Sequence, residues 1–313
     1  MTAAIESCCR DRVVVITGAG RGIGRAHALA LARAGAKIVV NDLGVSYGGE
    51  REAASPAASV AAEVRAFGGE AVANESDIAT WDGARRVIEQ ALDEFGHIDA
   101  LINNAAIIRP KAFIETSDAD FDETIRVNIK GTVLPTRAFA ERWSQQRRAS
   151  DVPASVVCTT SRVGLFGTPY YLTYGFTKSA VAYFVQAAAA ELASLAIRVN
   201  GIAPRADTRM MGDATRALHA AVGDAGLNAV FRAVGTAPPS ATATQLPESI
   251  APLAVWLISD RSRNITGRIF GSAAGRITVL EGWREINACQ LAPDHGVAEV
   301  EEALRSMLAV STA

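Results

Sequence analysis

The sequence predicts an α/β protein with one doubly wound parallel sheet and helices on both of its faces. Short apolar runs rich in β-branched residues recur along the chain, as they do in strands that are buried on both faces. Longer alanine- and leucine-rich segments alternate with these runs after short links. A glycine-rich turn joins the first run to the first of the longer segments. Regular alternation of strand and helix is typical of parallel sheets.

The first half of the chain contains the best-defined elements. Strands are predicted at 12–16, 37–42, 71–76 and 100–103, and helices at 23–34, 55–67 and 80–95. The helix at 55–67 has clear boundaries, because Ser55 can cap it, Pro56 suits its first turn and Gly68 can end it.

The second half continues the alternation and then departs from it. Helices are predicted at 118–147, 171–195 and 247–259, and strands at 154–160, 197–202 and 265–271. The segment 205–245 is a long insertion with apolar residues for one or two short helices, and it is either a substrate loop or a packed pair of surface helices. A C-terminal extension at about 276–313 contains a predicted helix at 297–308. We therefore interpret 1–313 as one domain with a core at about 10–275.

Composition excludes several classes of function. Of the residues, 49% are hydrophobic and 20% are charged, and the net charge is −2, so we expect no nucleic-acid partner and no anionic membrane surface. The expected partners are small molecules and copies of the chain itself. The four cysteines lack zinc-ligand spacing and are too few for a disulfide framework, so no metal site is expected. Since neither a signal peptide nor a long apolar stretch is found, we expect a cytoplasmic protein.

The glycine-rich turn at 17–24 predicts a phosphate-binding site. Gly18 permits a tight turn, Gly22 lets the backbone approach a pyrophosphate, and Gly24 lets the following helix pack close to the sheet. The amides at the start of that helix can then bind phosphate. A glycine turn alone is weak evidence. Its position between a predicted strand and a predicted helix favours dinucleotide binding by a Rossmann-type sheet.

Asp42 ends the second predicted strand, where a carboxylate can accept hydrogen bonds from the adenosine ribose. A 2′-phosphate would meet like charge there, so the sequence favours NAD over NADP. Asp42 could instead only cap a turn with Gly44, and Arg21 keeps NADP open as the less favoured cofactor. The candidate cofactor contacts, all near strand ends, are Gly18, Arg21, Gly22, Ile23, Gly24, Asp42, Leu43, Asp77, Ile78, Asn104, Ala105 and Ala106.

Ser161, Tyr174 and Lys178 are the candidate catalytic residues. Tyr174 and Lys178 are four residues apart on a predicted helix and therefore share a face, and Ser161 lies just past the fifth strand. An ammonium at about 4 Å, with an effective dielectric constant of about 20, would stabilise tyrosinate by about 4 kcal/mol. That energy would lower the pKa of Tyr174 by up to roughly three units. Tyr174 would then act as general acid/base, while the Ser161 hydroxyl holds the substrate oxygen.

The chain resembles the short-chain dehydrogenase/reductase family over roughly residues 10–275. The residues that carry the resemblance are those of the glycine turn, Asn103-Asn104-Ala105-Ala106, Ser161, Tyr174-Gly-Phe-Thr-Lys178 and Arg198-Val199-Asn200. The resemblance implies that Asn128 joins a proton relay to Lys178. It further implies that Lys178 and Tyr174 contact the cofactor, and that Pro204 and Thr208 flank the nicotinamide.

The resemblance also bears on assembly, and the chain departs from the family pattern at two positions. Helices such as those at 118–147 and 171–195 pair between subunits in the family, which implies a homodimer or homotetramer; alternatively, their alanine-rich faces only cover the sheet. Arg205 and Ala106 stand where the family usually has glycine. Neither change removes a reacting group. Arg205 either binds an anionic substrate group or points to solvent.

These observations predict an NAD-dependent oxidoreductase that interconverts a secondary alcohol and a ketone. The run at 40–44 is similar to that in the dehydrogenase units of peroxisomal-type multifunctional enzymes and in bacterial 3-hydroxyacyl-CoA and hydroxysteroid dehydrogenases, which suggests such substrates. One alternative is an NADPH-dependent 3-oxoacyl or ketone reductase, which Asp42 disfavours. Another is a cofactor-binding regulator without turnover, which the intact set of Ser161, Tyr174, Lys178 and Asn128 disfavours.

Overall fold

The structure is a computed structural model that describes residues 8–46, 49–145, 152–233, 245–273, 275–282, 288–290 and 296–309. The chain divides into two compact units, Met1–Leu280 and Glu281–Ala313. Within its described residues the second unit contains the helix α10 (Val297–Ala309). That the whole chain forms one domain stays a prediction.

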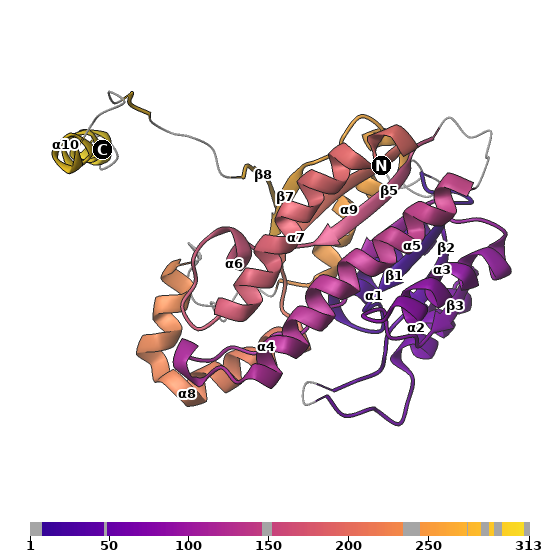
Figure 1. The fold of residues 1–313 in the computed structure, drawn as a ribbon. Helices are drawn as coiled ribbons and strands as arrows, with labels where there is room; N and C mark the ends of the chain where they lie inside the picture. The colour runs from indigo at the N-terminus through magenta and orange to yellow at the C-terminus, as the bar shows by residue number, and fades with distance from the viewer. Residues whose placement is uncertain are drawn as a thin grey trace. The chain divides into compact units, whose positions relative to one another are not determined.

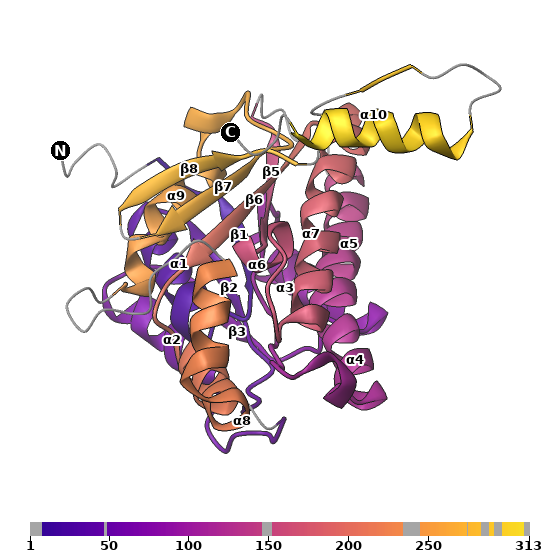
Figure 2. The same ribbon diagram turned by 90° about the vertical axis from the view of Figure 1, so that its left-hand side faces the viewer.

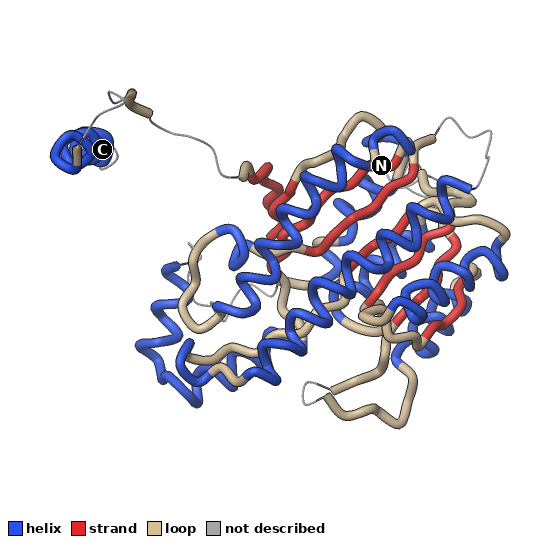
Figure 3. Tube along the Cα trace, in the orientation of Figure 1, coloured by secondary structure: helices blue, strands red, loops and turns tan. Residues whose placement is uncertain are grey.

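The first unit is built on an eight-stranded sheet with the order β3-β2-β1-β4-β5-β6-β7-β8 (Figure 3). The strands are β1 (Val13–Thr17), β2 (Lys37–Asn41), β3 (Ala71–Asn74), β4 (Ala100–Asn103), β5 (Ala154–Thr159), β6 (Ile197–Arg205), β7 (Ile269–Ala273) and β8 (Arg276–Leu280). All neighbours pair in parallel except β7 and β8, which are antiparallel. The predicted doubly wound α/β fold is confirmed.

Helices cover both faces of the sheet, with α1, α2 and α9 on one side and α3, α5 and α7 on the other (Figure 2). A hydrophobic layer lies between the sheet and each set of helices. Alternate residues of β1 point to opposite faces, so Val14 and Ile16 pack under α1, α2 and α9, while Val13 and Val15 pack under α3, α5 and α7. The helices α5 and α7 run side by side along their face (Figure 1). The helices of the first unit are α1 (Gly22–Arg33), α2 (Pro56–Ala66), α3 (Trp81–Phe95), α4 (Asp118–Ile125), α5 (Gly131–Gln145), α6 (Arg162–Leu165), α7 (Leu172–Glu191), α8 (Arg209–Ala233) and α9 (Ala251–Ile258).

The helix predicted at 118–147 differs most from the observed structure. Within the described residues it consists of α4, a π-helical turn (Arg126–Lys130) and α5. Hydrophobic periodicity reports only which face is buried and does not distinguish one helical hydrogen-bonding pattern from another. Single π turns are frequent at functional sites. This turn carries Asn128, which the resemblance assigns to a proton relay.

The end of β6 and the assignment of residues 276–280 also differ from prediction. β6 continues to Arg205, three residues beyond its expected end, because Pro204 and Arg205 still pair with β7. Residues 276–280, assigned above to the C-terminal extension, form the exposed edge strand β8. In the insertion, α8 consists of two helical segments that meet at a kink at Gly223 (φ 62°, ψ −171°), which agrees with the prediction of one or two short helices. The Pro-, Ser- and Thr-rich part of the insertion, 238–244, lies outside the described residues.

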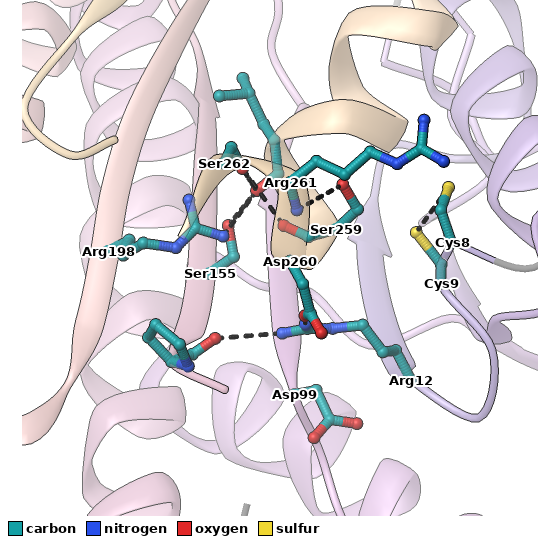
Figure 4. A network of polar contacts seen from close by, with 12 residues as sticks. Cys8, Cys9, Arg12, Asp99, Ser155, Arg198, Ser259, Asp260, Arg261 and Ser262 are labelled. Carbon is teal, nitrogen blue, oxygen red and sulfur yellow. Dashed lines mark hydrogen bonds and ion pairs between the residues drawn. The ribbon is translucent and has the colours of Figure 1, made fainter. Parts of the chain in front are cut away.

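A polar network closes the amino ends of the central strands (Figure 4). Arg12 Nη1 donates to Asp260 Oδ1 at 2.8 Å, and its Nη2 donates to Pro153 O at 3.1 Å. Arg198 Nη2 and Ser155 Oγ both donate to Leu257 O, at 2.8 and 2.9 Å. These contacts tie β1, β5 and β6 to the end of α9. The opposite, carboxyl ends of the strands are thereby held in a fixed relation.

None of the described helices is both long and apolar enough to cross a membrane. The same part of the chain contains no group of three or more His, Cys, Asp or Glu residues placed to hold a metal ion.

His27 on α1 makes the stability of this fold depend on pH. The side chain is 1% exposed, its Nδ1 has no hydrogen-bond partner, and burial lowers its pKa to about 4. An unfolded histidine has a pKa of about 6.5, so between these values the unfolded chain binds a proton that the folded chain does not. The contribution of neutral His27 to the free energy of unfolding is therefore fully present at neutral pH, and it is lost as the pH falls through this window. The loss amounts to about 2 kcal/mol between pH 7 and pH 5.

We expect His27→Leu to remove this dependence. Urea unfolding at pH 7 and pH 5 measures the free energy of unfolding. Between these two pH values it should fall by about 2 kcal/mol more in the wild-type protein than in the variant. His219→Leu, at an exposed position on α8, is the matched control and should behave as wild type. Equal pH dependence in wild type and His27→Leu would show that His27 does not cause it.

Candidate active site

The candidate residues gather where the parallel strands end. Thr17 of β1 is level with Asn41 of β2, Asn103 of β4 is level with Cys158 of β5, and Thr159 is level with Ile202 of β6. The glycine turn, Asp42, Asn104 and Ser161 each follow one of these strands. In open parallel sheets this edge is the usual ligand-binding edge.

The glycines of the turn meet two different requirements. A β-carbon on Gly24 would lie 2.2 Å from Gly18 O, and one on Gly18 would lie 2.7 Å from Ala105 Cα, so both positions require glycine for internal packing. Gly22 has φ +52°, and the atom nearest to its β-carbon position is Thr208 Cγ2 at 3.3 Å. Arg21, the N-cap of α1, makes no side-chain capping bond. The first amides of α1 therefore face a glycine-lined cradle that fits a dinucleotide phosphate.

Thr17 holds the turn in place, which sequence reasoning missed. Its Oγ1 accepts hydrogen bonds from Asn104 N at 3.0 Å and from Ala105 N at 3.1 Å. The Asn104 side chain donates in return to Thr17 O and Gly18 O, at 3.1 and 3.0 Å. The amide group of Asn104, predicted to contact the cofactor, thus fastens the end of β4 to the glycine turn. In the sequence, the one indication that Thr17 holds the turn is its hydroxyl group at the end of the first strand.

The Asp42 carboxylate hydrogen-bonds to the glycine turn and to the residues that follow β2, and it is also partly exposed. Its Oδ2 accepts from Gly20 N at 3.0 Å and its Oδ1 from Gly44 N at 2.9 Å. Each carboxylate oxygen can accept a further bond, and both Asp42 and Leu43 remain partly exposed. The turn-capping and ribose-binding interpretations are therefore compatible.

Asp77 and Ile78 are held by the protein itself. Asp77 accepts from Ala79 N at 3.0 Å and from Arg126 Nη1 at 2.8 Å. Ile78 is 5% exposed, and a β-carbon on Gly131 would lie 2.4 Å from its Cδ1. Because the Ile78 side chain is buried, only the backbone of Ile78 is left to contact the cofactor. The contacts predicted for both residues stay predictions.

The structure brings Ser161, Tyr174 and Lys178 together. Tyr174 hydrogen-bonds to Ser161. Lys178 Nζ lies 5.7 Å from the centre of the Tyr174 ring and donates to Thr159 O at 2.7 Å. Lys178 is 2% exposed, whereas Tyr174 is partly exposed. A phenol, a hydroxyl and an ammonium thus converge at the end of β5.

Gly164 allows these three side chains to converge, and no pattern in the sequence indicated its role. A β-carbon there would lie 2.5 Å from Lys178 C and 2.6 Å from Ser179 N, so only glycine lets the short helix α6 touch the backbone of α7. Ser179 Oγ donates to Gly164 O across the same contact. Ser161, the N-cap of α6, accepts from Val163 N at 3.2 Å and is thereby fixed beside Tyr174.

The prediction that Lys178 lowers the pKa of Tyr174 is wrong when only the protein's own groups are considered. Burial raises the pKa of Tyr174 to about 12, and the hydrogen bond with Ser161 acts in the opposite direction. Burial likewise lowers the pKa of Lys178 to about 8. Removal from water is the largest cause of both pKa shifts, and the Lys178 ammonium donates to Thr159 O. At neutral pH Tyr174 is therefore a protonated phenol, which is the form that donates a proton.

Asn128 connects the loop after β4 to α7. Its side chain accepts from Ile107 N at 2.8 Å and donates to Ile107 O and Thr177 Oγ1, each at 3.0 Å. Thr177 precedes Lys178 in the chain. Asn128 is fully buried and holds both segments beside the lysine. Its role in a proton relay stays a prediction.

The remaining predicted contacts lie around the same edge. Pro204 is partly exposed at the end of β6, and Thr208 Oγ1 accepts from Met211 N at 3.2 Å at the start of α8. Ile23 packs against the core under α1, and Ala106 is partly exposed.

Helix α8, from the predicted insertion, packs next to the catalytic candidates. Its Ala214 and Leu218 form a buried apolar cluster with Tyr171 and Ile108, and Tyr174 packs against that cluster. The insertion is therefore part of the wall around Tyr174. This placement favours the substrate-loop interpretation over a pair of surface helices that only packs on the fold.

A phenol beside a hydroxyl and an ammonium, at the strand ends next to a glycine cradle, defines an oxidoreductase that uses a nicotinamide cofactor. The family model for short chain dehydrogenases matches residues 12–218. The chain belongs to the short-chain dehydrogenase/reductase family.

Known proteins agree with this assignment. A short-chain type dehydrogenase/reductase of Mycobacterium tuberculosis is 36% identical over 80% of this chain and 78% of its own length. The peroxisomal multifunctional enzyme type 2 of Mus musculus is 33% identical over 88% of this chain, which spans 34% of that longer protein. A 3-oxoacyl-(acyl-carrier-protein) reductase of Staphylococcus epidermidis is 30% identical over 82% of this chain and 96% of its own length. A crystal structure of a short chain dehydrogenase from Mycobacterium avium superimposes with a TM-score of 0.79 at 35% identity, covering 97% of this chain and 96% of that one.

The packing of the cradle predicts the effect of Gly24→Ala. The added methyl group must displace Gly18 O or move α1, at a cost of about 1–3 kcal/mol, and we expect NAD binding to weaken by about tenfold or more. Isothermal titration calorimetry measures the Kd, and thermal unfolding measures the stability. Gly167→Ala, where the added carbon meets nothing within 4 Å, is the control. Normal NAD affinity in Gly24→Ala would contradict the proposed cradle.

Proposed function

We propose that the chain is an NAD-dependent oxidoreductase that interconverts a secondary alcohol and a ketone, with Tyr174 as the general acid/base. The observation that carries the proposal is the hydrogen bond between Tyr174 and Ser161 with the buried Lys178 ammonium beside them. The bound nicotinamide supplies or accepts the hydride. The residues of the chain bind the substrate oxygen and move its proton.

Each of the three side chains has a separate task in ketone reduction. The Ser161 hydroxyl orients the substrate oxygen toward Tyr174. Tyr174 gives its phenolic proton to that oxygen as negative charge develops there, and Lys178 stabilises the resulting tyrosinate. Oxidation of an alcohol reverses these steps. Asn128 donates to Thr177, the residue that precedes Lys178, which supports the proposed role of Asn128 and Lys178 in returning the proton to Tyr174.

Two features support NAD as the cofactor. The partly exposed carboxylate of Asp42 follows β2, where a 2′-phosphate would be repelled. Arg21, the cation that could bind such a phosphate, is paired with Glu52. Both features oppose the alternative of an NADPH-dependent reductase.

The apolar wall around Tyr174 supports a substrate with an apolar body. Ile108, Tyr171 and Leu218 form its buried part. Fatty acyl thioesters have such an apolar body, and the 3-oxoacyl reductase of Staphylococcus epidermidis is a relative named for such a substrate. Hydroxysteroids fit the same description and are the second substrate class to be tested.

We also propose that the chain forms a homodimer or homotetramer through α5 and α7. A surface hollow between these helices is lined by apolar side chains, including Phe184 and Leu192. Tyr183 on α7 is 73% exposed, and Phe176 is 55% exposed. Large exposed apolar side chains of this kind mark association surfaces.

The direct test is a spectrophotometric screen at the absorbance band of the reduced nicotinamide. 3-Hydroxyacyl-CoA thioesters, hydroxysteroids and simple cyclic alcohols are offered with NAD and with NADP. Turnover with NAD on the first or second class supports the proposal. No turnover with any alcohol or ketone and either cofactor would refute it.

Tyr174→Phe should abolish turnover while cofactor binding remains. Loss of a general acid lowers kcat by about 10²–10⁴-fold, whereas the phenol oxygen contributes little to the area that the cofactor contacts. Steady-state kinetics and the Kd for NAD are measured together. Tyr183→Phe, at an exposed position on the same helix, should retain wild-type kcat. Retained activity in Tyr174→Phe would remove Tyr174 from the mechanism.

Asp42→Ala should relax the preference for NAD. The ratio of kcat/KM with NAD to that with NADP should fall by about tenfold or more, since a like charge near the 2′-phosphate is removed. Asp42→Asn keeps an acceptor for the Gly44 amide and separates charge from turn geometry. An unchanged ratio in both variants would show that Asp42 serves the turn alone.

A further inference from the structure

Glu52 bridges two arginines that come from distant segments of the chain. It lies on the loop between β2 and α2, where its Oε2 pairs with Arg21 of the glycine turn. Its Oε1 accepts from Arg209 Nη1 at 3.1 Å, at the first residue of α8. Each carboxylate oxygen thus binds one guanidinium group.

The bridge is held in place by its surroundings. Glu52 N donates to Gly44 O at 2.8 Å, and Val45 pairs with Arg51 across the loop. The side chains of Glu52, Arg21 and Arg209 are 26%, 33% and 49% exposed, so water still reaches the cluster. The hydrogen bond from Arg209, together with the charge of Arg21, holds the pKa of Glu52 below its usual range. Glu52 is therefore ionised at neutral pH.

The cluster lies beside the ribose end of the proposed cofactor site. Arg21 directly follows Gly20, whose amide donates to Asp42 Oδ2 at 3.0 Å. Two guanidinium groups that converge on one anion are also a good binding site for a phosphate monoester. The same two cations would attract the 2′-phosphate that distinguishes NADP from NAD.

We propose that Glu52 acts as an internal substitute for that phosphate. Its carboxylate occupies the Arg21–Arg209 pair, which would otherwise bind the 2′-phosphate of NADP. Glu52 is then a selectivity residue outside the glycine turn and outside β2, separate from Asp42. The inference rests on the proposed function only in taking this edge of the sheet as the dinucleotide site.

The test measures binding of two nucleotides to the full chain without substrate. The probes are 2′,5′-ADP, which carries the additional phosphate, and 5′-ADP, which lacks it. In Glu52→Gln we expect calorimetry to show at least about tenfold tighter binding of 2′,5′-ADP and less than about threefold change for 5′-ADP. The gain should shrink in 1 M salt, where the screening length is about 3 Å.

Matched variants separate the specific effect from a general change of charge. Glu50→Gln removes the same charge from an exposed position on the same loop and should give no gain. Arg21→Gln in the Glu52→Gln background should cancel the gain. Glu52→Ala provides a second variant if Glu52→Gln folds poorly. The proposal is overturned if neither Glu52 variant gains affinity for 2′,5′-ADP, or if 5′-ADP gains as much.

The two proposals fail in different ways. Nucleotide binding requires no turnover, so the Glu52 result can be read even if no alcohol or ketone reacts. Turnover with NAD but no gain in the Glu52 variants would reject only the role of Glu52. A gain without any turnover would reject only the proposed reaction.

Discussion

The contact between α6 and the backbone of α7 is the constraint on which the active site depends. Since Gly164 has no side chain, the short helix that begins at Ser161 can lie against Lys178. Thr160 Oγ1 donates to Lys178 O at 2.9 Å, and Lys178 Nζ donates to Thr159 O at 2.7 Å. The two residues that precede Ser161 are thus both bonded to Lys178 of α7. The protein's own contacts thus position the hydroxyl, the phenol and the ammonium, which is the preorganisation that catalysis requires.

This arrangement has an energetic cost that the sheet must offset. A buried ammonium loses its hydration, and the lowered pKa of Lys178 together with the raised pKa of Tyr174 reports that loss. The apolar layers on both faces of the sheet supply the compensating stability. They also explain why the costly groups lie at the strand ends, where the chain leaves the core and backbone acceptors such as Thr159 O become available.

The sequence predicts the elements well and their contacts poorly. Alternation and glycine spacing identify the order of strands and helices, the cradle and the three catalytic candidates, because each is a local pattern. Gly164, Thr17 and Glu52 have no such pattern, since their importance arises from segments that the fold brings together. The direction of the Tyr174 pKa shift was wrong for the same reason. A four-residue spacing places a lysine near a tyrosine but says nothing of how deeply either is buried.

Helix α8 contacts both ends of the proposed site. Its first residue, Arg209, shares Glu52 with the glycine turn, and its Leu218 belongs to the apolar cluster against which Tyr174 packs. The kink at Gly223 lies beyond both of these contacts, so the first helical segment of α8 carries them both. In this chain the insertion therefore joins the Glu52 cluster to the apolar cluster beside Tyr174, since the same helical segment contacts both.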